Sequence, residues 1–101
     1  MNAEMTYVIP GILYDEICFV VDWYKEHKDE FASDPQFDWA MERLIGKAYS
    51  AHTDDGNFSI EIKRSVAYYL KEIVHEIEQE GSFSEQKSFN ELCKCVYQFG
   101  I

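Results

Sequence analysis

The clearest structural signal lies in residues 62–81, which read IKRSVAYYLKEIVHEIEQEG. Apolar side chains recur here at spacings of three and four, which places them on one face of an α-helix. The residues of this face are Ile62, Val66, Tyr69, Leu70, Ile73 and Ile77. Gly81 follows, in the position where glycine commonly ends a helix. Because a polar turn at residues 53–57 comes before it, the pattern predicts a helix over residues 59–80.

Three further helices are predicted around this one from the same spacing of apolar residues. The first covers residues 12–31. The second covers residues 35–50 and follows Asp34-Pro35, an acidic cap and a proline in the first turn. The last covers residues 84–98. Residues 5–10 favour an extended segment because Thr, Tyr, Val and Ile are common in strands, and Pro10-Gly11 then breaks the chain.

These elements predict an all-α fold, a compact four-helix domain with a short extended N-terminal segment. The chain has 101 residues, so residues 1–101 are expected to form a single domain. Hydrophobic residues make up 47% of the sequence, enough to form a core without a metal or a disulfide. The residues expected to be buried are Leu13, Ile17, Val20, Tyr24, Met41, Leu44, Val66, Leu70, Ile73, Ile77, Leu92 and Val96.

Negative charge is the outstanding feature of the composition. Nineteen acidic residues against nine basic ones give a formal net charge of −10. Such a field repels nucleic acids and anionic membranes and attracts basic proteins. The acidic residues are concentrated in two segments. Residues 15–38 carry eight carboxylates against two lysines, and residues 72–85 carry five carboxylates and no base.

The predicted helix over residues 12–31 carries an acidic face opposite its apolar one. Aromatic side chains lie on or beside this acidic face, a mixture that interfaces with basic proteins use because rings act as anchors and carboxylates pair with Lys and Arg. The expected partner-binding residues are Asp15, Phe19, Asp22, Trp23, Glu26, Asp29 and Glu30. In the alternative interpretation, this helix is buried on two sides. Phe19 and Trp23 then belong to the core.

Known catalytic and metal-binding patterns fit the sequence poorly. Residues 54–59 resemble a calcium-binding loop, but alanine and isoleucine would occupy two ligand positions that need oxygen. Glu72 and His75 are half of a di-metal motif that has no second half. Cys93 and Cys95 lack the spacing of a redox pair or a zinc site. We therefore expect no enzyme, no catalytic residue, no metal site and no cofactor.

The charge, the size and the mixed acidic and aromatic face favour a protein-binding inhibitor. The type of protein expected is a bacterial, cytoplasmic immunity protein, which neutralises a toxin by covering its active site or substrate surface. A nuclease toxin suits this role because its site must be basic to hold phosphates. The alternatives are a phage-type nucleic-acid mimic that inhibits a host nuclease or defence complex, a small helical metalloenzyme, and a homodimeric accessory protein. Direct binding to nucleic acid or to a membrane is not expected.

Overall fold

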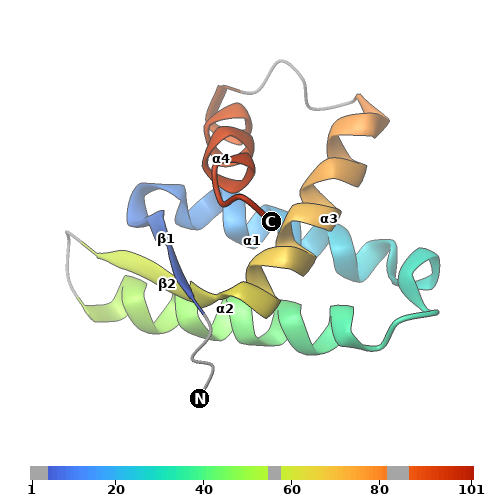
Figure 1. Cartoon of the computed structure of the whole chain (residues 1–101), viewed down its shortest axis with the longest axis horizontal. Helices are drawn as coiled ribbons and strands as arrows, with labels where there is room; N and C mark the ends of the chain where they lie inside the picture. The colour runs from blue at the N-terminus through green and yellow to red at the C-terminus, as the bar shows by residue number, and fades with distance from the viewer. Residues whose placement is uncertain (1–4, 55–57, 82–86) are drawn as a thin grey trace.

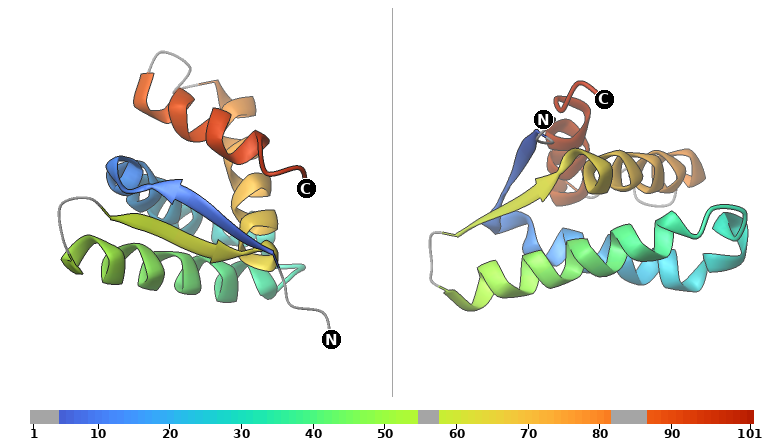
Figure 2. Two further views of the ribbon diagram at one scale, coloured as in Figure 1. Left: turned by 60° about the vertical axis from the view of Figure 1, so that its left-hand side comes forward. Right: turned by 60° about the horizontal axis from the view of Figure 1, so that its bottom comes forward.

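The computed structural model describes residues 5–54, 58–81 and 87–101 and shows a mainly helical fold with one small antiparallel sheet (Figure 1). Helices α1 and α2 lie side by side, and α3 crosses α2 (Figure 2). The elements in chain order are β1 (Thr6–Pro10), the short 3-10 helix η1 (Gly11–Leu13), α1 (Tyr14–Glu26), the 3-10 helix η2 (Lys28–Phe31), α2 (Gln36–Asp54), β2 (Ser59–Lys63), α3 (Arg64–Glu80) and α4 (Lys87–Tyr97).

The predicted compact, mainly α domain is confirmed, and so is the extended N-terminal segment, which forms β1. The helix predicted over residues 12–31 is shorter than expected, since α1 ends at Glu26 and a turn at His27 leads into η2. Its apolar periodicity stops near Tyr24, so the polar residues that follow have no core face to extend. The start predicted at residue 84 for the last helix lies outside the described residues.

The prediction of helix over residues 59–63 is wrong, because this segment is strand β2. Along β2 the side chains alternate between exposed and buried, with Ile60 and Ile62 facing inward. The strand pairs with β1 in antiparallel register, and Ile9 lies opposite Ile60. Pairing with a strand from the start of the chain buries these isoleucines, so tertiary contact overrides the helical spacing that continues into α3.

A close backbone approach joins the end of β1 to the residue before β2. The Gly11 N–H donates to the Phe58 carbonyl oxygen at 3.1 Å. A Cβ atom on Gly11 would lie 2.3 Å from that oxygen, so the approach requires glycine. The break predicted at Pro10-Gly11 is therefore also the point that fixes the sheet against η1.

All twelve residues expected in the core are buried. The sheet adds Ile9, Ile60 and Ile62 to this core. The predicted cap of α2 is also confirmed, since the Gln36 N–H donates to the Asp34 side chain at 2.9 Å. Gly81 ends α3 with a positive φ of 77°. In the described part of the chain, no helix is long and apolar enough to cross a membrane.

Candidate partner-binding site

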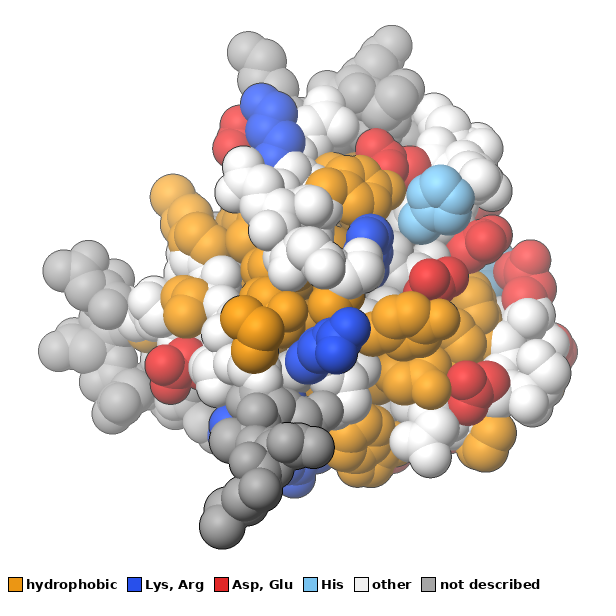
Figure 3. Space-filling view, viewed as in Figure 1, with side chains coloured by type: hydrophobic (Ala, Val, Ile, Leu, Met, Phe, Trp, Pro, Cys, Tyr) orange, Lys and Arg blue, Asp and Glu red, His pale blue; other side chains and the backbone are white. Residues whose placement is uncertain are grey.

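An acidic groove lies between the end of α1 and the last turns of α3. Its volume is about 290 Å³. This is near the lower end of the ~300–1,000 Å³ range of small-molecule pockets and suits a single long side chain. The residues that line it are Trp23, His27, Glu30, Glu76, Gln79 and Glu80. In Figure 3, acidic side chains gather with histidines on the right of the molecule, over α3 and the end of α1.

The helical repeat explains why α3 presents acidic residues here. Ile73 and Ile77 are fully buried on the inner face of this helix. Glu76 and Glu80 are four residues apart, so they lie one turn above the other on a neighbouring, exposed face. Two carboxylates from α3 therefore meet Glu30 from η2 across the groove.

Trp23 forms the floor of the groove and joins the two helices. Its side chain is only 7% exposed, and its indole Nε1 donates to Glu80 Oε2 at 3.0 Å. The His27 ring stacks on the indole, with a centroid separation of 3.9 Å and an interplanar angle of 15°. His27 Nδ1 lies 2.8 Å from the Trp23 carbonyl oxygen, an acceptor, so this nitrogen carries a proton. These contacts hold one of the three carboxylates at a fixed place.

The groove concentrates negative charge, and no Lys or Arg of the described residues lines it. The imidazole of His27 is among the groups that line it. In the described part of the chain, the ion pairs join Lys28 to Asp38 and Lys94 to Glu91, so neither involves a groove carboxylate. Among the described residues, the groove carboxylates therefore have no Lys or Arg paired with them.

The structure places the predicted partner-binding residues in two groups. The carboxylates of Asp15, Asp22, Glu26, Asp29 and Glu30 are exposed, as an interface with a basic partner requires. Of these, Glu30 alone lines the groove.

The aromatic residues of the predicted site lie inward. Trp23 is buried, so the core alternative describes its packing and its role as an exposed anchor is not supported. Phe19 is half-buried and packs edge-on against Phe89, with ring centroids 6.0 Å apart. A homodimer that paired these two rings across its interface would bury little additional surface of Trp23, because this side chain is only 7% exposed.

Sequence reasoning identified the second acidic segment but missed its contact with the first. The carboxylates of Glu76 and Glu80 carry a signal in their i, i+4 spacing, which predicts one shared face. No local pattern says that this face meets the end of α1. That contact depends on how α1 packs against α3 and α4.

The patterns tested for catalysis or metal binding stay without support. No cluster of metal-ligating side chains occurs in the described ranges. In the Glu72–His75 pair, His75 Nε2 lies 2.9 Å from the side-chain nitrogen Nε2 of Gln79, within hydrogen-bond distance. Burial raises the pKa of the Cys93 thiol to about 12, mainly by desolvation, so the thiolate nucleophile is disfavoured. Residues 55–57 of the calcium-like loop lie outside the described residues.

Comparisons with known proteins assign the chain to no family. No protein-family model matches the sequence, and no curated protein or solved structure gives a significant match.

Proposed function

We propose that this chain is a small acidic inhibitor that binds a basic protein through the acidic groove and the exposed carboxylates of α1 and η2. The observation that carries the proposal is the groove itself, where Glu30, Glu76 and Glu80 surround one cavity that no Lys or Arg of the described residues lines. An arginine or lysine from a partner would supply the opposite charge and gain charge-assisted hydrogen bonds.

The surroundings of the groove support recognition of a protein rather than a small ion. Asp22 and Glu26 on α1 extend the negative field beyond the cavity. Charges spread over a surface steer a basic partner toward it and speed association. The Trp23–Glu80 hydrogen bond links α1 to α3 and so keeps the two walls of the groove in register. A prearranged surface loses less conformational entropy on binding.

The most specific form of the proposal is a bacterial immunity protein that acts in the cytoplasm on a basic nuclease toxin. The nuclease class fits because a phosphate-binding site presents lysines and arginines that the groove can occupy. Free cysteines at positions 18, 93 and 95 support a reducing compartment. A phage-type nucleic-acid mimic would use the same surface, and a neighbouring toxin gene would favour the immunity protein over it.

The experiment is affinity purification of the tagged chain from its native host, with groove and control variants in parallel. The groove variant is Glu76→Gln with Glu80→Gln, and the control is Glu42→Gln with Glu91→Gln, which removes the same charge from other surfaces. We expect a basic protein that the parent and the control retain and the groove variant loses. Its nuclease activity should fall when the purified chain is added.

Two results would contradict the proposal. The first is equal retention of the same partner by the groove variant and the parent. The second is a partner with an acidic surface. Both variants are first compared with the parent by circular dichroism and melting temperature, because Glu80 also holds Trp23. The single variant Glu76→Gln leaves that hydrogen bond in place and tests the groove charge alone.

A further inference from the structure

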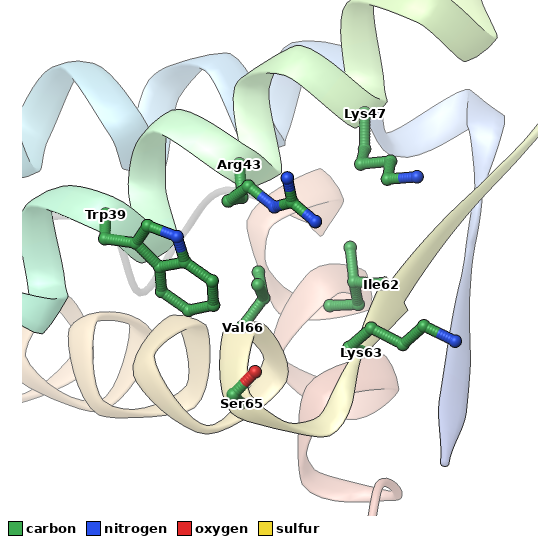
Figure 4. Close-up of a pocket in the computed structure, with 7 residues that line it drawn as sticks. All are labelled: Trp39, Arg43, Lys47, Ile62, Lys63, Ser65 and Val66. Carbon is green, nitrogen blue, oxygen red and sulfur yellow. The ribbon is translucent and has the colours of Figure 1, made fainter. Parts of the chain in front are cut away.

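A second cavity, which shares no residue with the acidic groove, is lined by basic side chains. It lies where α2 packs against the junction of β2 and α3, and its volume is about 60 Å³ (Figure 4). The residues that line this basic cavity are Trp39, Arg43, Lys47, Ile62, Lys63, Ser65 and Val66. A space of this size holds a single small chemical group and is too small for an extended peptide or a bilayer.

The repeat of α2 brings its three contributions to one side of the helix. Trp39, Arg43 and Lys47 follow one another at intervals of four, so they lie in a row. The positions directly after Trp39 and Lys47 are Ala40 and Ala48, which are fully buried. The row therefore runs along the edge of the core, next to the apolar floor that Ile62 and Val66 provide.

The charges at this cavity are segregated from the acidic residues that dominate the chain. Arg43, Lys47 and Lys63 are three of nine basic residues in a chain with nineteen acidic ones, and no acidic residue lines the cavity. Among the described residues, none of these three makes an ion pair within 4.0 Å. Glu42, which precedes Arg43, lines a different cavity facing α1. A cavity lined by three bases and no acid is unexpected at a net charge of −10.

Two of the three basic groups make contacts that leave their charge uncompensated. The Arg43 guanidinium lies 5.9 Å from the centroid of the Trp39 ring, within cation–π distance. Lys63 Nζ donates to the Thr6 hydroxyl oxygen at 3.3 Å, and this partner is neutral. Figure 4 shows the Arg43 side chain between Trp39 and Lys47, facing the wall formed by β2 and α3. Arg43 is therefore the central cation of the cavity.

From this arrangement we propose that the basic cavity binds the phosphate group of a small ligand. A phosphate carries about −1.5 to −2 charges and three strong acceptor oxygens, which matches several cations around one small space. A carboxylate carries one charge and two oxygens and leaves more of the positive charge uncompensated. The guanidinium fork of Arg43 suits phosphate recognition, and the first turn of α3 adds the positive end of its helix dipole. Trp39, 42% exposed, provides a ring beside the cavity.

This site is separate from the acidic groove. Ser65 at the basic cavity and Glu76 at the groove are eleven residues apart on α3. At 1.5 Å per residue, the helix separates them by about 17 Å. Charges at the surface are screened over ~8–10 Å at moderate ionic strength, so the two sites are electrostatically independent. A variant at one site should therefore leave binding at the other unchanged.

The test is a titration followed by backbone and indole N–H signals in two-dimensional NMR spectra. The ligands are sodium phosphate, adenosine monophosphate and sodium acetate, each added at the same ionic strength. We expect saturable shifts at Trp39, Arg43 and Ser65 with the two phosphate compounds, at least about tenfold tighter than with acetate. A monophosphate that binds at least about tenfold tighter than inorganic phosphate identifies a nucleotide, with Trp39 in contact with the base. Equal affinities identify the phosphate group alone.

Variants locate the binding in the cavity. Arg43→Gln should weaken phosphate binding by about tenfold or more, since it removes a charge-assisted contact, and Arg43→Lys should recover only part of it. Lys25→Gln removes the same charge from an exposed position on α1 and should bind as the parent does. The spectrum of each variant reports directly whether it is folded.

Three results would overturn the proposal. They are shifts that never saturate with phosphate, acetate binding as tightly as phosphate, and equal weakening in Arg43→Gln and Lys25→Gln. The last would mean that phosphate responds to overall charge and not to this cavity.

Discussion

Trp23 shows how one residue can join the core to the acidic groove. Its ring is buried, while its N–H reaches Glu80 at the groove. We expect Trp23→Phe to lower the free energy of unfolding by about 1–2 kcal/mol, because the hydrogen bond to a partly exposed carboxylate is lost and most of the ring stays. Trp23→Ala should lose about 3–5 kcal/mol. Urea unfolding measures both. Trp39→Phe, at a half-exposed tryptophan, is the control and should change stability by less than about 0.5 kcal/mol.

A second prediction at the residue scale concerns the hydrogen bond from the Tyr24 hydroxyl to Asp38 Oδ1, 2.9 Å long. Burial and this carboxylate raise the pKa of Tyr24 to about 12 from an ordinary value of 10.0. A folded-state pKa above the unfolded one gives stability that is complete below pH 10 and is lost as the pH rises toward 12. Tyr24→Phe should therefore lose less stability than the parent across this window. The measurement is the urea midpoint against pH, and parallel curves for the two proteins would contradict the assignment.

At the scale of elements, the junction of β1, η1 and β2 depends on one glycine. Gly11→Ala places a Cβ against the Phe58 carbonyl oxygen, and the backbone must move apart to accept it. We expect a loss of about 1–3 kcal/mol, the range for overpacked sites. Gly46 is the matched control, since a Cβ there meets nothing within 4 Å. Gly46→Ala should gain about 0.5–1 kcal/mol because it lies inside helix α2. Opposite shifts in melting temperature are the expected outcome.

The same junction marks the limit of what the sequence could predict. The four helices and their buried faces follow from local spacing, and Asp34 and Gly81 could be identified as ends because capping is a local interaction. Strand β2 could not be predicted from the sequence, because Ile62 fits both a helical spacing with Val66 and an alternating spacing with Ile60. Only pairing with its partner β1, about fifty residues earlier in the chain, decides between them.

Part of the candidate site could likewise be predicted from local sequence, and part depends on the tertiary structure. The acidic segments are visible in the composition, and Glu76 and Glu80 share a helix face by spacing alone. Their convergence with Glu30 is a property of the tertiary structure. The inward orientation of Trp23 is also a property of the tertiary structure, since α1 is covered from more than one side by α2, α3 and α4. A wheel drawn for an isolated helix assumes a single buried face and so assigns this ring to the surface.

At the scale of the whole molecule, a net charge of −10 makes an unpaired acidic groove unfavourable for the free protein. Glu76 and Glu80 are like charges at i, i+4, an arrangement that destabilises a helix by about 0.2–0.5 kcal/mol. We therefore expect Glu76→Gln to raise the free energy of unfolding by about that amount at low salt, while the same variant binds the proposed basic partner more weakly. Added sodium chloride should shrink the gain, because exposed charges are screened.

Glu42→Gln is the control for this last prediction, since Glu42 is exposed on α2 and lines the cavity that also contains Lys25 and Lys28. Removing a carboxylate beside those lysines should give no gain in stability at low salt. Urea unfolding at two salt concentrations separates the variants. If Glu76→Gln is less stable than the parent, the Glu76 side chain stabilises the fold. If the variant is more stable and binds as the parent does, the Glu76 charge contributes neither to stability nor to binding. A gain in stability together with a loss of binding is the pattern of a surface that is kept for a partner, because the free protein folds better without it.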